Sequence, residues 1–497
     1  MAAANRSGNG TGPWHSPSPI FIEKNMPLTF TSMRKVFVDI CGSEHVIADP
    51  QCIRNYGHDQ TLNLHYDAEL IIRPGSPEEI SAILKICSQH RIAVTPRGGG
   101  SGVTGGALPI RGGIILSLER LNRVLSINQE DRYIVAESGV VTADLCRAAE
   151  NEGLYFPVAP SSKDFSFVGG NVAENAGSIR SCKYGTTSSF VRNLEVVLPN
   201  GAIVWTGSNV AKNATGLNVT PLFVGSEGTL GIITKVVYKL IPRPTSEVWL
   251  LAGFANLRQA CDAVLDIKRS GLSPSAVELI CKNALELTAT HLNRPLPLVK
   301  ENVDAHLLLE LQEDSDAAMI GSLEALAGIV QRHTSEEIMV AESAAQKKVL
   351  GQLRFSIGDA MTTAGRNYRD VDACVPAANL YAYILEVERI CQQYGIPLVC
   401  FGHALDGNLH TMLLLDSGGA ADEPSRVEKA VAAIYHYAVT AGGVISGEHG
   451  IGCLQKEYMP LQFSDNQLAL MYSIKSALDP AGILNPGKMF SYQPIDV

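Results

Sequence analysis

Two histidines flank a predicted tight turn in the segment FGHALDGNLH, which runs from Phe401 to His410. The Asp406-Gly407 pair is a strong signal for a two-residue β-hairpin turn, and counting outward from it pairs His403 with His410. Directly opposed residues of an antiparallel pair have Cβ atoms roughly 5 Å apart on the same face of the sheet. Both imidazoles are therefore expected to reach one metal ion, although core or surface histidines without a ligand are the usual explanation for such a pair.

A carboxylate and a third imidazole follow in the segment SGEHGIG, from Ser446 to Gly452. Glu448 and His449 would point to opposite faces of an extended strand, but Gly447 and Gly450 favour an irregular turn in which both side chains address one site. Alone, the segment would be interpreted as a solvent-exposed loop. Together with the paired histidines it supplies one oxygen and two nitrogens, a donor set that suits zinc or manganese with positions left open for a substrate.

A second kind of site is indicated by the segment RGGGSGVTGG, which covers residues 97–106 and contains six glycines. Its G-x-G-x-x-G pattern follows a predicted strand, as in a Rossmann dinucleotide site. A Rossmann loop opens into a helix, however, whereas Pro109 and the Gly112-Gly113 pair precede another strand-like run, Ile114 to Leu118. The sequence therefore predicts a phosphate site made of successive backbone N–H groups, with a glycine-rich surface loop as the alternative.

Three further segments are rich in glycine, asparagine and small residues. They are SSKDFSFVGGNVAENAG from Ser161 to Gly177, KYGTT from Lys183 to Thr187, and FVGSEGTLG from Phe223 to Gly231. A chain that needs close backbone approach at four separated places is expected to wrap one long ligand.

The elements that position these segments can be placed from the hydrophobic pattern. Ser76-Pro77-Glu78-Glu79 is a capping box that starts a helix over residues 76–90, between strands on either side. A second helix is expected to be capped by Thr142 and to stop at Gly153. After Pro242, amphipathic helices alternate with apolar runs, which predicts a second, α/β domain.

Length and composition favour a globular protein of two or more domains. The chain has 497 residues, of which 46% are hydrophobic and 18% charged. The net charge of −10 and the absence of a basic run argue against a nucleic-acid partner. The 11 cysteines are scattered, which fits reduced thiols and excludes a ferredoxin-type cluster of closely spaced ligands within the chain. No apolar run reaches the roughly 18 residues of a transmembrane helix, and the N-terminus lacks an apolar signal core and reads as a flexible tail.

Taken together, the four glycine-rich segments resemble the FAD-binding domain of the vanillyl-alcohol oxidase / p-cresol methylhydroxylase superfamily. FGHALDGNLH, SGEHGIG and LDPAGILNPGK (Leu478 to Lys488) narrow the resemblance to the 2-hydroxy-acid dehydrogenase branch, which includes the glycolate oxidase FAD subunit, D-lactate dehydrogenase and D-2-hydroxyglutarate dehydrogenase. The resemblance covers roughly Ala68 to the C-terminus. It implies an α+β fold in which a two-subdomain FAD-binding domain is followed by an α/β substrate (cap) domain.

The resemblance also implies domain boundaries and cofactor contacts. We expect an N-terminal tail and helical extension over 1–65, the FAD-binding domain over 66–244, the substrate and metal-binding cap over 245–455, and a segment over 456–497 that returns to the flavin. The residues expected to bind FAD are Arg97, Gly98, Gly99, Gly100, Ser101, Gly102, Gly105, Gly106, Pro160, Ser161, Gly169, Gly170, Asn171, Asn175, Gly177, Tyr184, Gly185, Gly228, Gly231, Ile232, Ile233 and Asn485. Because the first glycine loop contains no histidine, FAD is expected to be non-covalent.

Site residues follow from the same resemblance. It places divalent-metal ligands at His403, His410 and Glu448, a catalytic base at His449, and a carboxylate-binding arginine at Arg354. The planar fork of an arginine suits bidentate binding, although without the resemblance Arg354 would be interpreted as a helix-surface arginine. In NYRDVDACVP, Asp370 stands where some relatives have lysine, which weakens the case for a D-2-hydroxyglutarate substrate.

The function expected from the resemblance is FAD-dependent, metal-assisted oxidation of a small D-2-hydroxy acid, D-lactate or glycolate, to the 2-oxo acid. Electrons would pass to a quinone, a cytochrome, an electron-transfer flavoprotein or a separate iron–sulfur subunit. D-2-hydroxyglutarate dehydrogenase is the alternative, followed by a non-catalytic FAD subunit of an oxidase and by an oxygen-using, metal-free oxidase. A cytoplasmic location is expected, with peripheral association with the inner membrane or assembly into a homodimer as further expectations.

Overall fold

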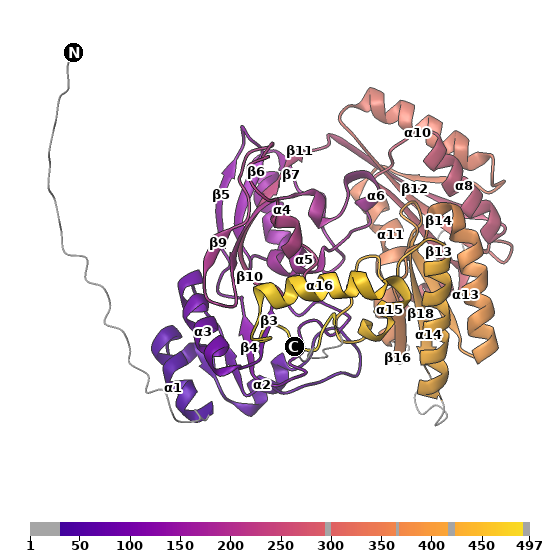
Figure 1. Cartoon of the computed structure of the whole chain (residues 1–497). Helices are drawn as coiled ribbons and strands as arrows, with labels where there is room; N and C mark the ends of the chain where they lie inside the picture. Colours follow the sequence, from indigo (N-terminus) through magenta and orange to yellow (C-terminus); the bar gives the residue numbers. More distant parts are fainter. Residues whose placement is uncertain (1–29, 294–299, 364–366, 416–422, 491–497) are drawn as a thin grey trace, which may run out of the picture.

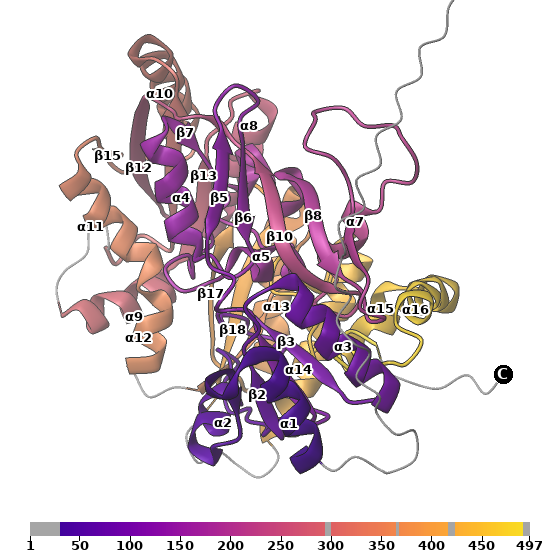
Figure 2. The same ribbon diagram turned by 90° about the vertical axis from the view of Figure 1, so that its left-hand side faces the viewer.

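The computed structural model describes residues 30–293, 300–363, 367–415 and 423–490. Figure 1 shows two sheets in the N-terminal half, drawn in indigo and magenta, beside a large sheet in the C-terminal half, drawn from magenta-pink to orange. Helices are packed against the sheets in both halves, and Figure 2 shows the same halves from the side. The chain therefore has the α+β fold that the sequence indicates.

The first sheet carries the glycine-rich loop. Its four strands are ordered β1-β2-β4-β3, and β4 pairs in parallel with both β2 and β3. The predicted helix lies between β2 and β3, where Ser76 Oγ accepts from the Glu79 N–H at 3.2 Å and the Glu79 carboxylate accepts from the Gly75 N–H at 2.7 Å. No helix lies between β3 and β4, so the loop is not of the Rossmann type. The elements are α1 (Phe30–Cys41), η1 (Ser43–His45), β1 (Val46–Ile47), α2 (Pro50–Tyr56), β2 (Leu70–Ile72), α3 (Pro77–His90), β3 (Val94–Arg97) and β4 (Ile114–Ser117).

The second sheet has five antiparallel strands in the order β5-β6-β10-β8-β9, and α4 and α5 pack on it. The N-cap of α4 is Val141, so the prediction that Thr142 caps this helix was wrong. Thr142 is instead the first residue of the helix, and its buried hydroxyl donates to the Ser166 carbonyl at 3.0 Å rather than accepting from a helix N–H group. The elements are β5 (Val124–Asn128), β6 (Tyr133–Glu137), α4 (Thr142–Asn151), β7 (Leu154–Tyr155), α5 (Val168–Glu174), α6 (Ser181–Tyr184), η2 (Thr187–Ser189), β8 (Val191–Val197), β9 (Ile203–Trp205), α7 (Thr220–Phe223), β10 (Ile232–Lys239) and β11 (Ile241–Pro242), which pairs with β7.

The third sheet has seven antiparallel strands in the order β15-β12-β14-β13-β17-β18-β16. Apolar side chains of α8, α10, α13 and α14 cover one face, and those of α9, α11 and α12 cover the other. The elements are β12 (Ser246–Phe254), α8 (Leu257–Arg269), β13 (Ala276–Cys281), α9 (Lys282–Leu292), β14 (Ala305–Glu313), α10 (Asp316–Gln331), β15 (Met339–Ala341), α11 (Ala344–Phe355), α12 (Ile357–Thr363), β16 (Asn367–Val371), η3 (Ala377–Asn379), α13 (Leu380–Tyr394), β17 (Leu398–His403), β18 (Asn408–Leu415) and α14 (Glu423–Thr440).

The C-terminal segment returns from the third sheet to the first. It forms η4 (Lys456–Tyr458), α15 (Met459–Gln462) and α16 (Asp465–Leu478), and Figure 1 shows α16 lying across both halves of the molecule. Beyond α16, the Ile483 carbonyl accepts from the Val94 N–H of β3, and the Asn485 N–H donates to the Val94 carbonyl, both at 2.8 Å. Among the described helices, none combines the length and apolar character of a membrane span.

Candidate active site

A cavity of about 990 Å³ lies between the glycine-rich loops and the third sheet. Of the residues expected to bind the flavin, these line it: Arg97, Gly98, Gly99, Gly100, Ser101, Gly102, Gly106, Pro160, Ser161, Gly169, Gly170, Asn171, Gly177, Gly228, Gly231, Ile232, Ile233 and Asn485. Gly105, Asn175, Tyr184 and Gly185 are not among the lining residues. Tyr184 instead donates from its hydroxyl to Gln312 Oε1 at 3.0 Å, and Asn175 Oδ1 accepts from Thr186 and Ser188.

The lining leaves room for a ligand that approaches the backbone closely. A Cβ added to Gly102 or to Gly170 would meet no atom within 4 Å, so these two positions face open space. Gly100 and Gly228 have φ values of +66°, in the left-handed region that favours glycine. The Nη1 nitrogen of Arg97 is buried without a hydrogen-bond partner among the described residues, and it lines the same cavity. Open backbone and the guanidinium of Arg97, whose Cζ lies 5.6 Å from the centroid of the Tyr56 ring, together fit the phosphates of a dinucleotide cofactor.

The two histidines of the hairpin lie on the same face of the third sheet, but in a register different from the predicted one. His403 pairs with Asn408, and His410 pairs with Phe401. The two-residue turn was wrong because the Gly407 N–H donates to the His403 carbonyl at 3.0 Å, which closes a loop over residues 404–407. A shift of two residues keeps each side chain on its original face. The histidine rings therefore still meet, with centroids 5.3 Å apart.

His403, His410 and Glu448 form a group that fits a metal ion. The Nε2 atoms of His403 and His410 lie 3.3 and 3.4 Å from Glu448 Oε1, and the three donor atoms lie within 4.8 Å of one another. Ligands about 2.0 Å from a tetrahedral zinc ion are separated by roughly 3.3 Å. The donor types and their spacing thus fit a small divalent cation with an open position.

Glu278, which the sequence analysis did not identify, organises this group from β13. The carboxylate is 1% exposed, and Oε1 lies 2.5 Å from His403 Nδ1. Burial opposes a charged imidazole, but Glu278 and Glu448 outweigh burial and raise the pKa of His403 to about 10. Burial also raises the pKa of Glu448, yet His403 and its neighbours lower it to about 2. With Nδ1 directed at Glu278, His403 presents Nε2 to the donor group.

The loop that carries Glu448 and His449 is held by Asp372. The carboxylate is fully buried, and Oδ2 accepts from the N–H groups of Gly447, Glu448 and His449 at 2.8–3.0 Å and from the Ser446 hydroxyl at 2.8 Å. The irregular turn inferred from the flanking glycines is confirmed, because both side chains address one site. Asp372 therefore fixes the conformation of this turn. The sequence analysis had assigned it no role.

A second carboxylate, Glu227, holds the next part of the same loop. Glu227 accepts from the Ile451 and Gly452 N–H groups, both at 2.7 Å, and is buried. It lies in the FVGSEGTLG segment, next to Gly228 of the cavity lining. Residues 446–452 are therefore held by hydrogen bonds to Asp372, which follows β16, and to Glu227, which lies in the N-terminal half of the chain.

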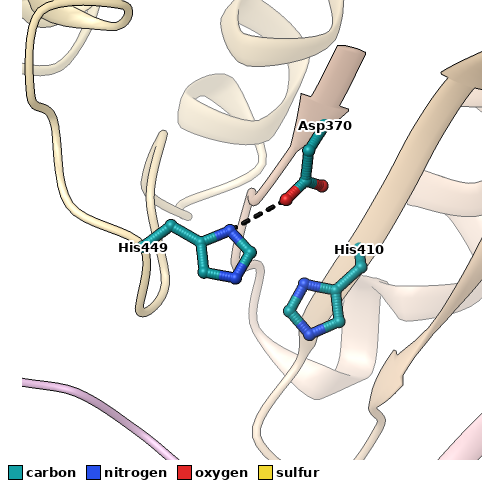
Figure 3. A group of neighbouring side chains, drawn as sticks. All are labelled: Asp370, His410 and His449. Carbon is teal, nitrogen blue, oxygen red and sulfur yellow. Dashed lines mark ion pairs between the residues drawn. The ribbon is translucent and has the colours of Figure 1, made fainter. Parts of the chain in front are cut away.

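His449 lies beside two carboxylates, that of Asp370 on β16 and that of Asp372 directly after this strand. Its Nδ1 lies 2.9 Å from Asp370 Oδ2 and 3.9 Å from Asp372 Oδ2. Figure 3 shows the imidazole of His449 with one edge facing Asp370 and the ring of His410 beside it, and the two rings stack with their centroids 5.1 Å apart. Burial lowers the pKa of His449, but Asp372 and Asp370 outweigh burial and raise it to about 10. This is well above the usual value of about 6.5 for an imidazole, and a nearby divalent cation would act in the opposite direction.

Arg354 of α11 reaches the same cavity and is not a helix-surface arginine. Its Nε donates to Glu278 Oε2 at 2.7 Å, and its Cζ lies 4.5 Å from the centroid of the Phe401 ring. The side chain is 11% exposed and lines the cavity beside His403 and His410. Glu278 therefore orients both the histidine and the arginine.

The chain matches two protein families and is similar to several known proteins. The FAD binding domain family matches residues 68–207, and the family described as FAD linked oxidases, C-terminal domain, matches residues 243–489. The chain is 36% identical to the glycolate oxidase subunit GlcD of Bacillus subtilis over 88% of its length and 92% of that protein. It is 34% identical to a D-lactate dehydrogenase of Anaerostipes hadrus, covering 90% of the chain and 94% of the relative.

The chain is also similar to a third relative in sequence and to a solved structure in fold. A D-2-hydroxyglutarate dehydrogenase of Stutzerimonas stutzeri is 30% identical over 90% of the chain and 96% of that protein. The fold of p-cresol methylhydroxylase, solved with substrate bound, superposes with a TM-score of 0.77 and 17% identity over 93% of this chain and 96% of that chain.

Proposed function

The chain belongs to the FAD-linked oxidases and is an FAD-dependent oxidoreductase, and from this premise we propose that it oxidises a small D-2-hydroxy acid, D-lactate or glycolate, to the 2-oxo acid. One observation carries the proposal. The group His403, His410 and Glu448 opens into the same cavity as the glycine-rich loops, together with Arg354 and His449. A 2-hydroxy acid offers a carboxylate, a hydroxyl and a Cα hydrogen, and each has a counterpart among these groups.

We assign the roles as follows. Arg354 binds the substrate carboxylate through its terminal nitrogens, since Nε is engaged by Glu278. His403, His410 and Glu448 hold a divalent cation, zinc or manganese. FAD supplies a two-electron acceptor, and the cation supplies Lewis acidity toward the substrate hydroxyl. Nε2 of His449 takes the hydroxyl proton while a hydride leaves Cα, so that the O–H and C–H bonds break and a C=O bond forms.

The electrons then leave for a separate acceptor. Every cysteine of the described chain is a free thiol, and the group formed by His403, His410 and Glu448 contains no cysteine. This supports an external quinone, cytochrome, electron-transfer flavoprotein or iron–sulfur subunit. The absence of a histidine between Arg97 and Gly106 supports non-covalent FAD, so acid precipitation should release the flavin into the supernatant; flavin retained in the pellet would contradict this.

D-2-hydroxyglutarate is the second candidate substrate, because Arg369 also lines the cavity and offers a second cation. Against it, Asp370 lines the cavity beside Arg369, and Arg369 already faces Glu428, with Nε 4.0 Å from Oε1. A second substrate carboxylate would be repelled by Asp370. A panel of 2-hydroxy acids in anaerobic flavin bleaching decides between them, and fastest bleaching by D-2-hydroxyglutarate would overturn the monocarboxylate assignment.

The different roles proposed for Glu448 and His449 can be tested by changing each residue separately. His449→Ala should keep FAD and metal but slow flavin reduction in anaerobic single-turnover mixing by about 10²–10⁴-fold, the usual contribution of a positioned base. Glu448→Ala should lose the metal first. His333→Ala is the matched control, because His333 pairs with Asp266 outside the cavity. Metal loss in His449→Ala would reassign His449 as a ligand, and an unchanged reduction rate would remove it from the mechanism.

A further inference from the structure

The carboxylate of Asp370 faces the imidazole that the proposed mechanism uses as its base. Asp370 lies on the edge strand β16, opposite Met412 of β18, and therefore on the face of the sheet that also carries His410. Its Oδ2 lies 2.9 Å from Nδ1 of His449. Figure 3 shows that the Asp370 side chain comes from a strand and the His449 side chain from a loop, and that the two face each other. The contact is short enough for a charge-assisted hydrogen bond.

This contact decides which nitrogen of His449 is free for chemistry. A carboxylate is an acceptor, so Nδ1 must carry the hydrogen, and the other nitrogen, Nε2, then holds the lone pair of the neutral ring. Nε2 lies on the side of the ring toward Glu448, 3.9 Å from Oε1. Stacking against His410 at an interplanar angle of 17° limits rotation of the ring. The imidazole is thus oriented from two directions, with Nε2 toward the proposed metal ligands.

Asp370 has fewer competing partners than the neighbouring carboxylate. Asp372 Oδ2 lies 3.9 Å from His449 Nδ1 and already accepts from four donors of the Ser446–His449 segment. Asp370 Oδ1 is buried without a hydrogen-bond partner among the described residues, and the side chain is only 15% exposed. A carboxylate buried with one main partner is costly unless that partner is charged or strongly polar. His449 is the partner that accounts for Asp370 at this position.

We propose that Asp370 is a positioning residue for His449: its Oδ2 accepts the Nδ1 hydrogen, fixes the tautomer and presents Nε2 to the substrate hydroxyl. This inference rests on the proposed function, because it assigns Asp370 to the same proton-transfer step.

The test compares Asp370→Asn in two backgrounds by anaerobic single-turnover flavin reduction, with the hydroxy acid that bleaches the unmodified protein fastest. In the otherwise unmodified chain, Asp370→Asn should slow the limiting reduction rate by at least about tenfold, up to the roughly 10²–10⁴-fold loss of the whole base. The substrate concentration at half-maximal rate should change little, because Arg354 and the proposed metal ligands remain. FAD and metal content should be unchanged.

In the His449→Ala background, Asp370→Asn should have no further effect, because a positioning residue acts only through the group that it positions. A purely structural role would lower the rate by the same factor in both backgrounds, and that outcome overturns the inference. The matched control is the same double-mutant comparison made with Asp266→Asn and His333→Ala. That pair lies 3.0 Å apart outside the cavity, and neither change should affect flavin reduction.

Failure of the proposed function is distinguishable from failure of this inference. If His449→Ala leaves flavin reduction unchanged, the base assignment fails and Asp370 loses its proposed role with it. If His449→Ala slows reduction but Asp370→Asn does not, only the role of Asp370 is rejected. Should Asp370→Asn fail to retain FAD, Asp370→Glu is measured in the same two backgrounds. That variant keeps the charge, and equal factors in both backgrounds would again reject the role.

Discussion

Oε1 of Glu278 lies 2.5 Å from Nδ1 of His403, and the second oxygen of the same carboxylate holds Arg354 at 2.7 Å. One buried residue on β13 therefore orients a proposed metal ligand and the proposed substrate-binding arginine. Loss of a partner of this kind usually lowers metal affinity by about ten- to a hundredfold.

Glu278→Gln should weaken the metal affinity of the fully deprotonated site, extrapolated from titrations at several pH values, by about 10–100-fold, because an amide is a poorer acceptor for the Nδ1 hydrogen of His403. FAD content should not change, since Glu278 lies in the third sheet. Metal titration of the metal-free protein measures the effect. Glu310→Gln is the control, because it removes a buried carboxylate of the same sheet that pairs with Arg180 instead. Equal loss of metal affinity in both variants would mean that the effect is general damage to the sheet.

His403→Ala and His410→Ala should each lose the metal and nearly all turnover while FAD is retained, because each removes one of three proposed donors. Elemental analysis and the flavin absorbance of the purified proteins provide the measurement. Retention of a full equivalent of metal by both variants would show that the paired histidines do not form the site.

Arg354→Lys should lower kcat/KM by roughly ten- to a hundredfold, which corresponds to the loss of a charge-assisted hydrogen bond worth about 1.5–3 kcal/mol. A lysine keeps the charge but cannot bind Glu278 through one nitrogen and a substrate carboxylate through two others. Steady-state kinetics with the preferred hydroxy acid measure the change. Arg389→Lys, which alters an exposed arginine paired with Glu386, is the control. An unchanged kcat/KM in Arg354→Lys would end its assignment as a substrate ligand.

Metal affinity should depend on pH through His403. The pKa of His403 is raised from 6.5 to about 10 in the metal-free site, so its imidazole is protonated at neutral pH and a cation must displace that proton. The pKa of Glu448 is about 2, and that of His410 is well below its usual value, so neither adds a proton to this exchange. His449, whose pKa is also raised to about 10, should release its proton as well when a cation binds beside it, so apparent affinity should rise by about ten- to a hundredfold per pH unit from neutral pH until about pH 10 and then level off. Competition with a chelator at several pH values tests this, and a flat profile would contradict it.

Local sequence patterns predicted those features whose determinants are close together in the chain. The helix begun at Ser76 and the glycine-rich loop after β3 could be predicted because the cap, the proline and the glycines act locally. The faces of His403 and His410 were also predictable, since alternation along a strand survives a two-residue change of register. The register itself was not, because the Ala404 N–H is taken by the Val277 carbonyl of another strand.

Local sequence patterns could not identify the carboxylates that arrange the site. Glu278, Asp372 and Glu227 lie in or beside apolar strands and small-residue segments with no motif of their own. Their partners are far away in sequence, so only the folded topology brings them together. The same holds for Tyr184, which stays a predicted flavin-binding residue and whose hydroxyl donates to Gln312, 128 residues away in the third sheet.

The pairing of β3 with Ile483–Asn485 has a consequence for the order in which the protein is made. The first sheet and its glycine-rich loop leave the ribosome early, but the segment that covers the β3 edge leaves only after the whole third sheet has been synthesised. During that interval β3 is an open edge with unpaired N–H and C=O groups, a surface on which nascent chains associate. Asn485 also joins the two early loops, donating to the Gly106 and Glu227 carbonyls at 3.0 and 2.7 Å. Completion of the flavin cavity is therefore a late event in the synthesis of the chain, and a nascent chain stalled before Ile483 should depend on chaperones to stay unaggregated.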